Sequence, residues 1–262
     1  MTEPLAFDAP APPDRVAITH PTRAALMGDL EGRMRRGEGF ALATLNLDHL
    51  VKLRAPGAEG DAFRRAYARQ THVVADGNPV VWLHRLAGRG AVRLVPGSEL
   101  VGPLCAAAAA TGTPVALVGS TEEALDAAAA RLERAHPGLR IALRHAPPMG
   151  FDPEGPEAAA VLDRLRAAAP AGLCFLALGA PRQERFAAHA LSRLSGWGFA
   201  SVGAGIDFVA GGQRRAPPWV RRIALEWLWR LAGSPRRLLG RYASCFRILP
   251  GLALRALAAR RS

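Results

Sequence analysis

The stretch that decides the fold is Val115–Arg134, which reads VALVGSTEEALDAAAARLER. Its first four residues are apolar and suit a buried strand. From Thr121 onward, alanine, leucine, glutamate and arginine recur at helical spacing, and Gly119 and Ser120 form a short turn between the two parts. The stretch therefore predicts one strand–turn–helix unit of an α/β protein.

Similar apolar runs recur on both sides of this unit. We expect strands at Phe40–Thr44, His72–Ala75, Leu173–Leu178 and Phe199–Val202, and a further helix at Glu157–Ala169. Strands that alternate with helices at this spacing form a mainly parallel sheet. The sequence thus predicts an α/β, Rossmann-like fold: a mainly parallel sheet with helices on both faces.

The composition is that of a globular protein. Of the 262 residues, 50% are hydrophobic and 21% are charged, which is enough to bury a core. The cysteine count is odd and low, which argues against a disulfide framework; we expect Cys105, Cys174 and Cys245 to be core or helix-face residues and not nucleophiles. Residues 1–14 are interpreted as a disordered leader without the apolar centre of a signal peptide, and no apolar run approaches the ~20 residues that span a bilayer. We therefore expect a cytoplasmic location.

Positive charge is concentrated at the C-terminal end. The segment from Arg214 to Ser262 contains twelve arginines and one acidic residue, Glu226, and so carries +11 of the formal net charge of +12. The rest of the chain is nearly neutral. We interpret residues 15–212 as an α/β core and residues 213–262 as an Arg-rich helical appendage.

The appendage has the pattern of amphipathic helices. Four apolar residues from Trp219 to Leu231 fall at steps of four, which predicts one helix that ends before Pro235. A second helix is expected to end at Pro250-Gly251. Basic amphipathic helices rich in tryptophan and leucine suit an anionic membrane surface. Ordinary helices with solvated arginines are the alternative interpretation.

Small and polar residues follow four of the predicted strands, in the turns Thr44-Leu45-Asn46, Asp76-Gly77-Asn78, Gly119-Ser120-Thr121 and Gly179-Ala180-Pro181. Because open parallel sheets bind ligands outside the carboxyl ends of their strands, we expect these turns to line one site. Asp76 also precedes Pro79, a residue suited to the first turn of a helix. Asp76 is therefore a candidate general base or acceptor of a ligand hydroxyl, with a plain helix-capping turn as the alternative.

Other signatures are weak or missing. The run Gly203-Ala204-Gly205-Ile206-Asp207 begins like a dinucleotide fingerprint, but Phe208 takes the place of the third glycine. Gln183 offers an amide that both donates and accepts, as recognition of a sugar hydroxyl requires. The sequence has no Asp-x-Asp pair, no metal-ligand spacing among its seven histidines, no Walker loop and no nucleophile elbow. We therefore expect no metal and no cofactor.

A series of short motifs occurs in order from about Arg15 to about Tyr242. They are Thr44-x-Asn46, Ala75-Asp76-Gly77-x-Pro79-Val80, Gly97-Ser98-Glu99-Leu100, Leu178-Gly179-x-Pro181-x-Gln183-Glu184, Gly203-x-Gly205-x-x-Phe208-x-x-Gly211, Arg215-Ala216-Pro217, and Leu225-Glu226-Trp227-x-x-Arg230-Leu231 with Pro235-x-Arg237 and Arg241-Tyr242. In this order and spacing the chain resembles the WecG/TagA/CpsF family of bacterial glycosyltransferases. Three positions depart from the family's usual pattern: Leu45 replaces a proline, Leu94 falls where the family has an arginine (with Arg93 one residue before it), and Glu99 replaces an aspartate.

The resemblance implies an inverting, metal-independent transfer of a hexose or N-acetylhexosamine-type sugar. The donor would be a UDP-sugar, and the acceptor a polyprenyl-pyrophosphate-linked saccharide at the inner face of the plasma membrane, in the synthesis of exopolysaccharide or teichoic acid. It implies that Asp76 is the catalytic base. The candidate substrate-binding residues are Thr44, Asn46, Gly119, Ser120, Gly179, Gln183, Gly205 and Asp207, and the arginines expected at the diphosphate or the membrane are Arg214, Arg215, Arg221, Arg222, Arg237 and Arg241.

Two competing interpretations remain. A nucleic-acid-binding protein could use the basic tail for phosphate contacts, but it would not need the residues that line the strand ends. A nucleotide-dependent dehydrogenase is disfavoured by the incomplete glycine fingerprint. We expect no nucleic-acid partner.

Overall fold

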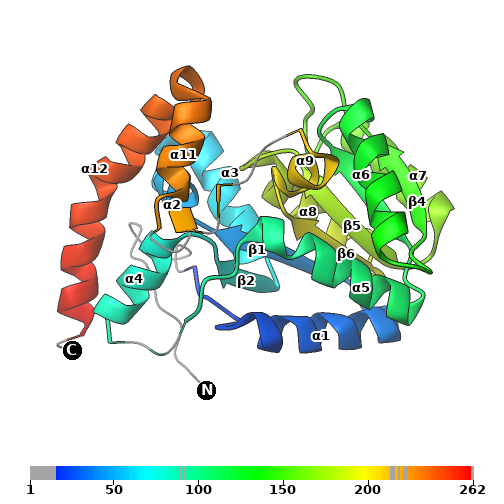
Figure 1. Cartoon of the computed structure of the whole chain (residues 1–262), viewed down its shortest axis with the longest axis horizontal. Coiled ribbons are helices and arrows are strands. Elements are labelled where there is room, and N and C mark those ends of the chain that lie inside the picture. Colours follow the sequence, from blue (N-terminus) through cyan, green and yellow to red (C-terminus); the bar gives the residue numbers. More distant parts are fainter. Residues whose placement is uncertain are drawn as a thin grey trace.

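The computed structural model describes residues 16–88, 90, 92–212, 216–217, 219–220 and 224–260, so the predicted leader lies outside it. A six-stranded sheet forms its centre, and every neighbouring pair of strands is parallel (Figure 1). In spatial order the strands are β2 (His72–Ala75), β1 (Phe40–Leu45), β6 (Trp197–Ser201), β5 (Gly172–Ala177), β3 (Val115–Gly119) and β4 (Ile141–His145). The predicted α/β fold with a mainly parallel sheet is confirmed.

Helices cover both faces of the sheet. One face carries α1 (Arg23–Arg36), α5 (Val101–Thr111), α6 (Glu122–Ala135) and α9 (Gly205–Ala210). The other face carries α3 (Gly57–Ala68), α7 (Pro156–Ala168) and α8 (Arg182–Leu191), with α2 (Leu47–Leu53) and α4 (Asn78–Leu86) beside them. A short 3-10 turn, η1 (Gly97–Glu99), leads into α5.

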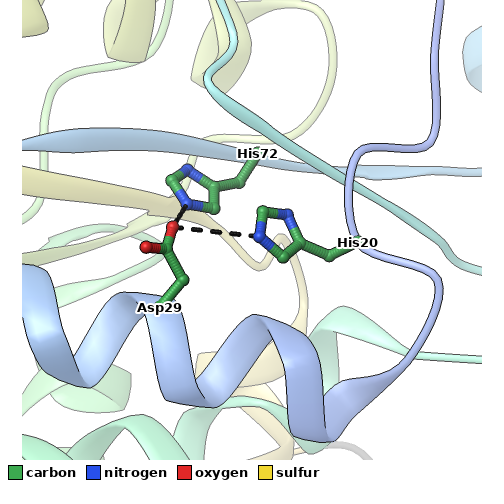
Figure 2. A group of neighbouring side chains, drawn as sticks. All are labelled: His20, Asp29 and His72. Atoms are coloured by element: carbon green, nitrogen blue, oxygen red, sulfur yellow. Dashed lines mark hydrogen bonds and ion pairs between the residues drawn. The ribbon is translucent and has the colours of Figure 1, made fainter. Parts of the chain in front are cut away.

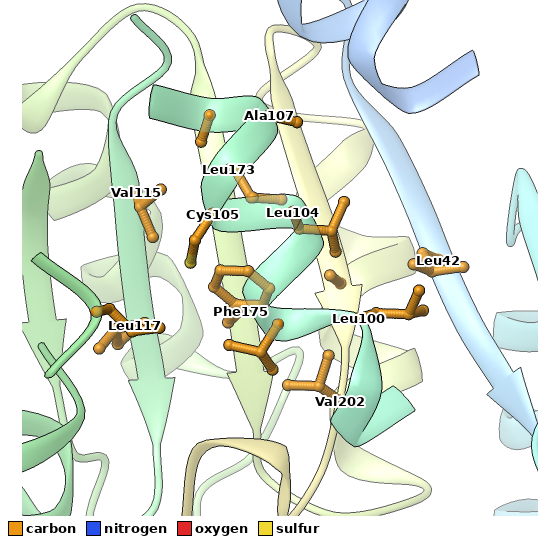
Figure 3. Close-up of a cluster of buried hydrophobic side chains, with 14 of the residues drawn as sticks. Leu42, Leu100, Leu104, Cys105, Ala107, Val115, Leu117, Leu173, Phe175 and Val202 are labelled. Atoms are coloured by element: carbon orange, nitrogen blue, oxygen red, sulfur yellow. The ribbon is translucent and has the colours of Figure 1, made fainter. Parts of the chain in front are cut away.

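Alternation along the strands decides which helix each side chain meets. In β1, Phe40 and Leu42 belong to the core beneath α1 and α5, whereas Ala41 and Ala43 belong to clusters on the opposite face. Figure 3 shows the first core: Leu100, Leu104 and Cys105 lie over β1, β3 and β5. Helices thus shield both faces of the central strands from water, which explains why these strands are apolar throughout. All three cysteines are free and buried, as predicted: Cys105, Cys174 and Cys245.

The decisive stretch folds as the sequence predicts. Thr121 caps α6, because its hydroxyl oxygen accepts a hydrogen bond from Ala124 N at 3.3 Å. Glu122 and Glu123 follow in the first turn, where acidic side chains stabilise the helix dipole. Gly119 has φ +116°, and a Cβ there would lie 2.5 Å from the backbone of Ala177. Only glycine therefore allows β3 and β5 to approach so closely at the end of the strand.

The C-terminal helices differ from the prediction in two places. The expected helix from Trp219 to Leu231 is wrong in its middle, since Ala224 has φ +59° and α11 (Glu226–Gly233) begins only after it. The expected end at Pro250 is also wrong, because α12 (Pro235–Ala259) continues through it. A proline inside a helix costs roughly 3 kcal/mol. Burial of Leu252 and Ala256 beyond it offsets that cost.

Helix α12 packs against α2 and α4, beside the ends of β1 and β2 (Figure 1). Leu252 and Ala256 join the same buried cluster as Val80 and Leu83 of α4. Through this packing, the C-terminal helices form one wall of the region above the strand ends.

Among the described residues, no helix combines the length and the apolarity needed to cross a membrane.

Candidate active site

A cavity of about 680 Å³ lies at the carboxyl ends of β1, β2, β5 and β6. The turns after these strands form its floor, and side chains of α4, α11 and α12 form the opposite wall. This is the edge at which open parallel sheets bind ligands. Of the four turns that we expected to line one site, those after β1, β2 and β5 contribute residues to this cavity, and the turn after β3 does not.

Most of the predicted site residues meet in this cavity. The residues that line it are Thr44, Asn46, Asp76, Gly179, Gln183, Gly205, Asp207 and Arg241. Gly119 and Ser120 do not line it, but the Ser120 hydroxyl donates to Asp207 Oδ1 at 2.5 Å and so holds that carboxylate. Four of the predicted arginines, Arg214, Arg215, Arg221 and Arg222, lie outside the described residues, as does the side chain of Arg237.

Asp76 lies directly after β2 and is half-buried. Its backbone N–H donates to Leu45 O at 2.7 Å, and its Oδ2 accepts from Gly97 N at 3.4 Å. The next residue, Gly77, has φ +104° and is the N-cap of α4, whose first turn contains a proline. A Cβ on Gly97 would lie 3.0 Å from Thr44 Oγ1. The absence of a side chain at Gly97 therefore lets η1 lie close to the ends of both β1 and β2. These contacts place one carboxylate at the floor of the pocket.

The turn after β1 holds its polar residues in fixed positions. The Thr44 hydroxyl donates to Ser201 O at 3.4 Å, across to the end of β6. Asn46 Oδ1 accepts from His49 N at 3.1 Å and caps α2. The cap uses the carbonyl oxygen of Asn46, so its amide nitrogen is the group available to a ligand.

A buried polar layer supports Gln183 beneath the pocket. Gln183 Nε2 donates to Glu184 Oε1 at 2.8 Å, and both side chains are buried. One hydrogen of the amide nitrogen is therefore used by Glu184, and Gln183 Oε1, which has no hydrogen-bond partner within the described part of the chain, lies beside Gly203. This orientation makes Gln183 an acceptor for a ligand hydroxyl or amide.

The charge state of this layer is set by burial. Burial raises the pKa of Glu184 from 4.5 to about 7. Burial also lowers the pKa of His49 from 6.5 to about 3, and His49 Nδ1 lies 2.7 Å from the Tyr67 hydroxyl. His49 Nε2 is 3.9 Å from Glu184 Oε1. Glu184 appears in a quoted motif, but the sequence did not indicate its role, because only the fold shows that it is fully buried.

Sequence reasoning missed an ionic cluster on the pocket wall. Asp48 Oδ2 accepts from Lys52 Nζ at 2.7 Å and pairs with an Arg241 guanidinium nitrogen at 3.0 Å. Lys52 Nζ also donates to Ala180 O at 2.9 Å. One carboxylate thus binds two cations and joins α2 to α12 and to the turn after β5. Asp48 and Lys52 are four residues apart in one helix, and this spacing could have predicted their ion pair from the sequence. The sequence carries no such signal for the pair with Arg241.

The opposite wall is largely apolar. Trp227 of α11 makes edge contacts with Tyr242 and Phe246 of α12, with ring centroids 5.8 and 5.2 Å apart. Leu94 also lines the cavity, whereas Arg93 is not among the lining residues described. At the position where the resemblance expects an arginine, the pocket therefore presents an apolar side chain.

The fold and the pocket define a class of protein: an open-sheet α/β protein whose ligand site lies at the carboxyl edge of the strands. The chain belongs to the glycosyl transferase WecG/TagA/CpsF family, whose family model matches residues 14–262. This confirms the resemblance seen in the motifs and favours a glycosyltransferase over a nucleic-acid-binding protein.

Curated relatives carry a more specific name. The chain is 29% identical over 178 residues to the N-acetylglucosaminyldiphosphoundecaprenol N-acetyl-beta-D-mannosaminyltransferase of Staphylococcus aureus strain MW2, an alignment that covers 68% of this chain and 67% of the relative. It is also 29% identical over 170 residues to the protein of the same name from strain NCTC 8325 / PS 47, covering 64% of each chain. The alignments thus span about two thirds of the length of these relatives.

Proposed function

We propose that this protein is an inverting glycosyltransferase that moves a hexose or N-acetylhexosamine-type sugar from a UDP-sugar to a polyprenyl-pyrophosphate-linked saccharide. The observation that carries the proposal is the position of Asp76, a half-buried carboxylate directly after β2 that lines the strand-end pocket, in a chain of this family. The names of the relatives support an N-acetylmannosaminyl donor and an N-acetylglucosaminyl-diphosphate-lipid acceptor.

In the proposed reaction, the Asp76 carboxylate takes the proton of the acceptor hydroxyl as the hydroxyl oxygen attacks the anomeric carbon. The new carbon–oxygen bond forms on the face opposite the diphosphate. The bond between the anomeric carbon and the diphosphate breaks, and UDP leaves with the electron pair. One base is enough for this transfer, in contrast to the two carboxyl groups of a glycoside hydrolase.

The departing diphosphate needs positive charge. The N-termini of α4 and α8 point toward this edge of the sheet, where helix dipoles favour anions. Lys52 and Arg241 contribute the cationic side chains of the described wall. The proposal assigns the rest of this role to Arg214, Arg215, Arg221 and Arg222.

The two halves of the pocket match the two parts of a lipid-linked acceptor. Polar strand ends suit the sugar and the diphosphates, and the wall from α11 and α12 suits a polyprenyl chain. The outer surfaces of the same helices suit the inner face of an anionic plasma membrane, because exposed apolar side chains lie among arginines there. Those more than 40% exposed that do not line the pocket are Leu228, Trp229, Leu239, Leu254 and Leu257.

The test is a transfer assay with candidate UDP-sugars and a short-chain polyprenyl-diphosphate N-acetylglucosamine acceptor. Asp76→Asn should bind UDP normally but lower kcat by about 10²–10⁴-fold, as expected for loss of a general base. Asp163→Asn, which changes an aspartate that is 74% exposed on α7, is the matched control and should leave kcat unchanged. Near-normal turnover by Asp76→Asn would remove Asp76 from the role. Absence of transfer by the unaltered protein with every UDP-sugar would overturn the function itself.

A further inference from the structure

Three potential metal ligands converge at the other end of the sheet. His20 precedes α1, Asp29 lies within α1, and His72 is the first residue of β2 (Figure 2). Asp76 follows the end of the same strand, so the cluster and the pocket lie roughly 13 Å apart along β2, at about 3.3 Å per residue. The cluster is therefore separate from the proposed active site.

The geometry brings the three ligand atoms to one point. Asp29 Oδ2 lies 2.6 Å from His72 Nε2 and 3.8 Å from His20 Nε2, and all three atoms lie within 4.8 Å of one another. The two imidazole rings stack with centroids 4.8 Å apart and an interplanar angle of 16°, so their Nε2 atoms point to the same side. In sequence the two histidines are far apart, which is why their spacing did not indicate a site.

A threonine hydroxyl supports each ring from behind. Thr71 Oγ1 lies 2.7 Å from His72 Nδ1, and Thr19 Oγ1 lies 2.9 Å from His20 Nδ1. Backbone N–H groups of Ala41 and Val73 donate to these hydroxyl oxygens at 2.9 and 2.8 Å and fix their positions in the sheet. Metal-binding histidines are typically held in this way at their second ring nitrogen.

The hydroxyls also let each ring change its tautomer without moving. Each one lies within reach of a backbone carbonyl, Ala41 O at 3.1 Å for Thr71 and Val73 O at 3.3 Å for Thr19. When a hydroxyl donates to its ring, Nε2 carries the proton that faces Asp29. When the hydroxyl donates to the carbonyl instead, it accepts from Nδ1–H, and Nε2 presents a lone pair. The ring keeps one proton in both cases.

The surroundings favour the neutral form of both histidines and the ionised form of Asp29, which are the forms that bind a metal ion. Burial lowers the pKa of His20 and of His72 below the ordinary value, and the hydrogen bond with His72 lowers the pKa of Asp29. Arg33 Nε also donates to Asp29 Oδ2, at 3.2 Å, but a carboxylate has enough lone pairs to accept from Arg33 and bind an ion. Asp29 and His20 keep exposed side-chain surface, 37% and 19%, so an ion and a water ligand have access.

We propose that His20, Asp29 and His72 form a binding site for a divalent first-row transition metal, for which Zn²⁺ is the best fit. Two imidazole nitrogens and one carboxylate oxygen are a ligand set that suits zinc, with water in the fourth position. The ion would tie the segment before α1 to α1 and to β2. Because the cluster lies at the opposite end of β2 from the pocket, we expect the ion to stabilise the fold and not to take part in sugar transfer.

The test uses the full chain after removal of metal with a chelator. Titration with Zn²⁺ by calorimetry, and with Co²⁺ by visible absorption, should show one equivalent bound, with ligand-field bands of a four-coordinate Co²⁺ site. Mg²⁺ should not bind, because it prefers oxygen ligands. Asp29→Asn and His20→Gln should each weaken Zn²⁺ binding by at least about tenfold, as expected when a ligand is lost. His136→Gln, at the end of α6, is the matched control and should bind as the unaltered protein does.

Circular dichroism verifies that each variant is folded before the affinities are compared. The alternative is that Asp29 and His72 form an ion pair and do not bind metal. In that case the unaltered protein would show no stoichiometric Zn²⁺ binding, and this result would overturn the proposal. Equal affinity in Asp29→Asn, His20→Gln and the control would also overturn it, since the metal would then bind elsewhere.

Discussion

Replacing Glu184 by glutamine tests the buried polar layer beneath the pocket. Burial holds the pKa of Glu184 at about 7 in the folded chain, against an ordinary value of 4.5. A carboxyl whose pKa is raised by folding contributes stability that is complete below 4.5 and is lost as the pH rises through 7. At about 1.4 kcal/mol per pKa unit, the loss amounts to about 3 kcal/mol.

Glutamine has nearly the same shape and cannot ionise. Its Oε1 can still accept from Gln183 Nε2, and its extra hydrogens replace the hydroxyl hydrogen of the protonated acid. We therefore expect Glu184→Gln to match the unaltered protein in stability at pH 4.5 and to exceed it by about 2–3 kcal/mol at pH 8. His49, whose pKa is lowered by burial, loses its contribution as the pH falls below 6.5, but it does so in both proteins.

Urea unfolding at a series of pH values measures the difference. Glu59→Gln, which changes an exposed glutamate at the start of α3, is the control: it keeps Glu184, so its stability should differ from that of the unaltered protein by the same amount at every pH. A difference between Glu184→Gln and the unaltered protein that does not change between pH 4.5 and 8 would refute the reasoning. So would a variant that is less stable than the unaltered protein at pH 8.

Three further outcomes are expected. Gln183→Leu should lower kcat/KM for the donor by about tenfold, the effect of one neutral hydrogen bond lost, and titration of UDP-sugar against initial rate measures it. Exhaustive chelation should leave transfer unchanged, because the sequence has no Asp-x-Asp pair; activity that returns only with added Mg²⁺ or Mn²⁺ would contradict this. Leu239→Ser combined with Leu254→Ser should weaken co-sedimentation with anionic vesicles at least about tenfold without unfolding the protein, since both side chains are more than 60% exposed. Met149→Ser, on a loop away from α12, is the control for that experiment.

The central part of the fold could be predicted because its signals are local. The strand Val115–Gly119 is an apolar run, and α6 begins at a threonine cap followed by two glutamates. β4 was missed because it is an edge strand that is only half-buried and contains Arg144. None of its residues is fully buried, so its sequence lacks the continuous apolar run that marked the buried strands, the other edge strand β2 included.

The C-terminal part was less predictable because tertiary contacts decide it. Local propensity places a helix end at Pro250, and burial of Leu252 and Ala256 against α4 overrides that propensity. The floor of the site was accessible from the sequence, since Asp76 and Asn46 follow recognisable strands. Partners that arise from long-range packing, such as Asp48 with Arg241, carry no local signal.

The ion cluster at Asp48 has a practical consequence, since the chain contains a single lysine, Lys52, and its amine lies on the wall of the cavity. Reagents that acylate ε-amino groups can therefore address one side chain, which already holds hydrogen bonds to Asp48 and Ala180. Peptide mass spectrometry, which separates a label on Lys52 from one on the α-amino group, would then report on the pocket, because a molecule that fills it shields the only ε-amine in the protein. The rate at which that single label appears becomes a measure of occupancy that needs no knowledge of the sugar transferred.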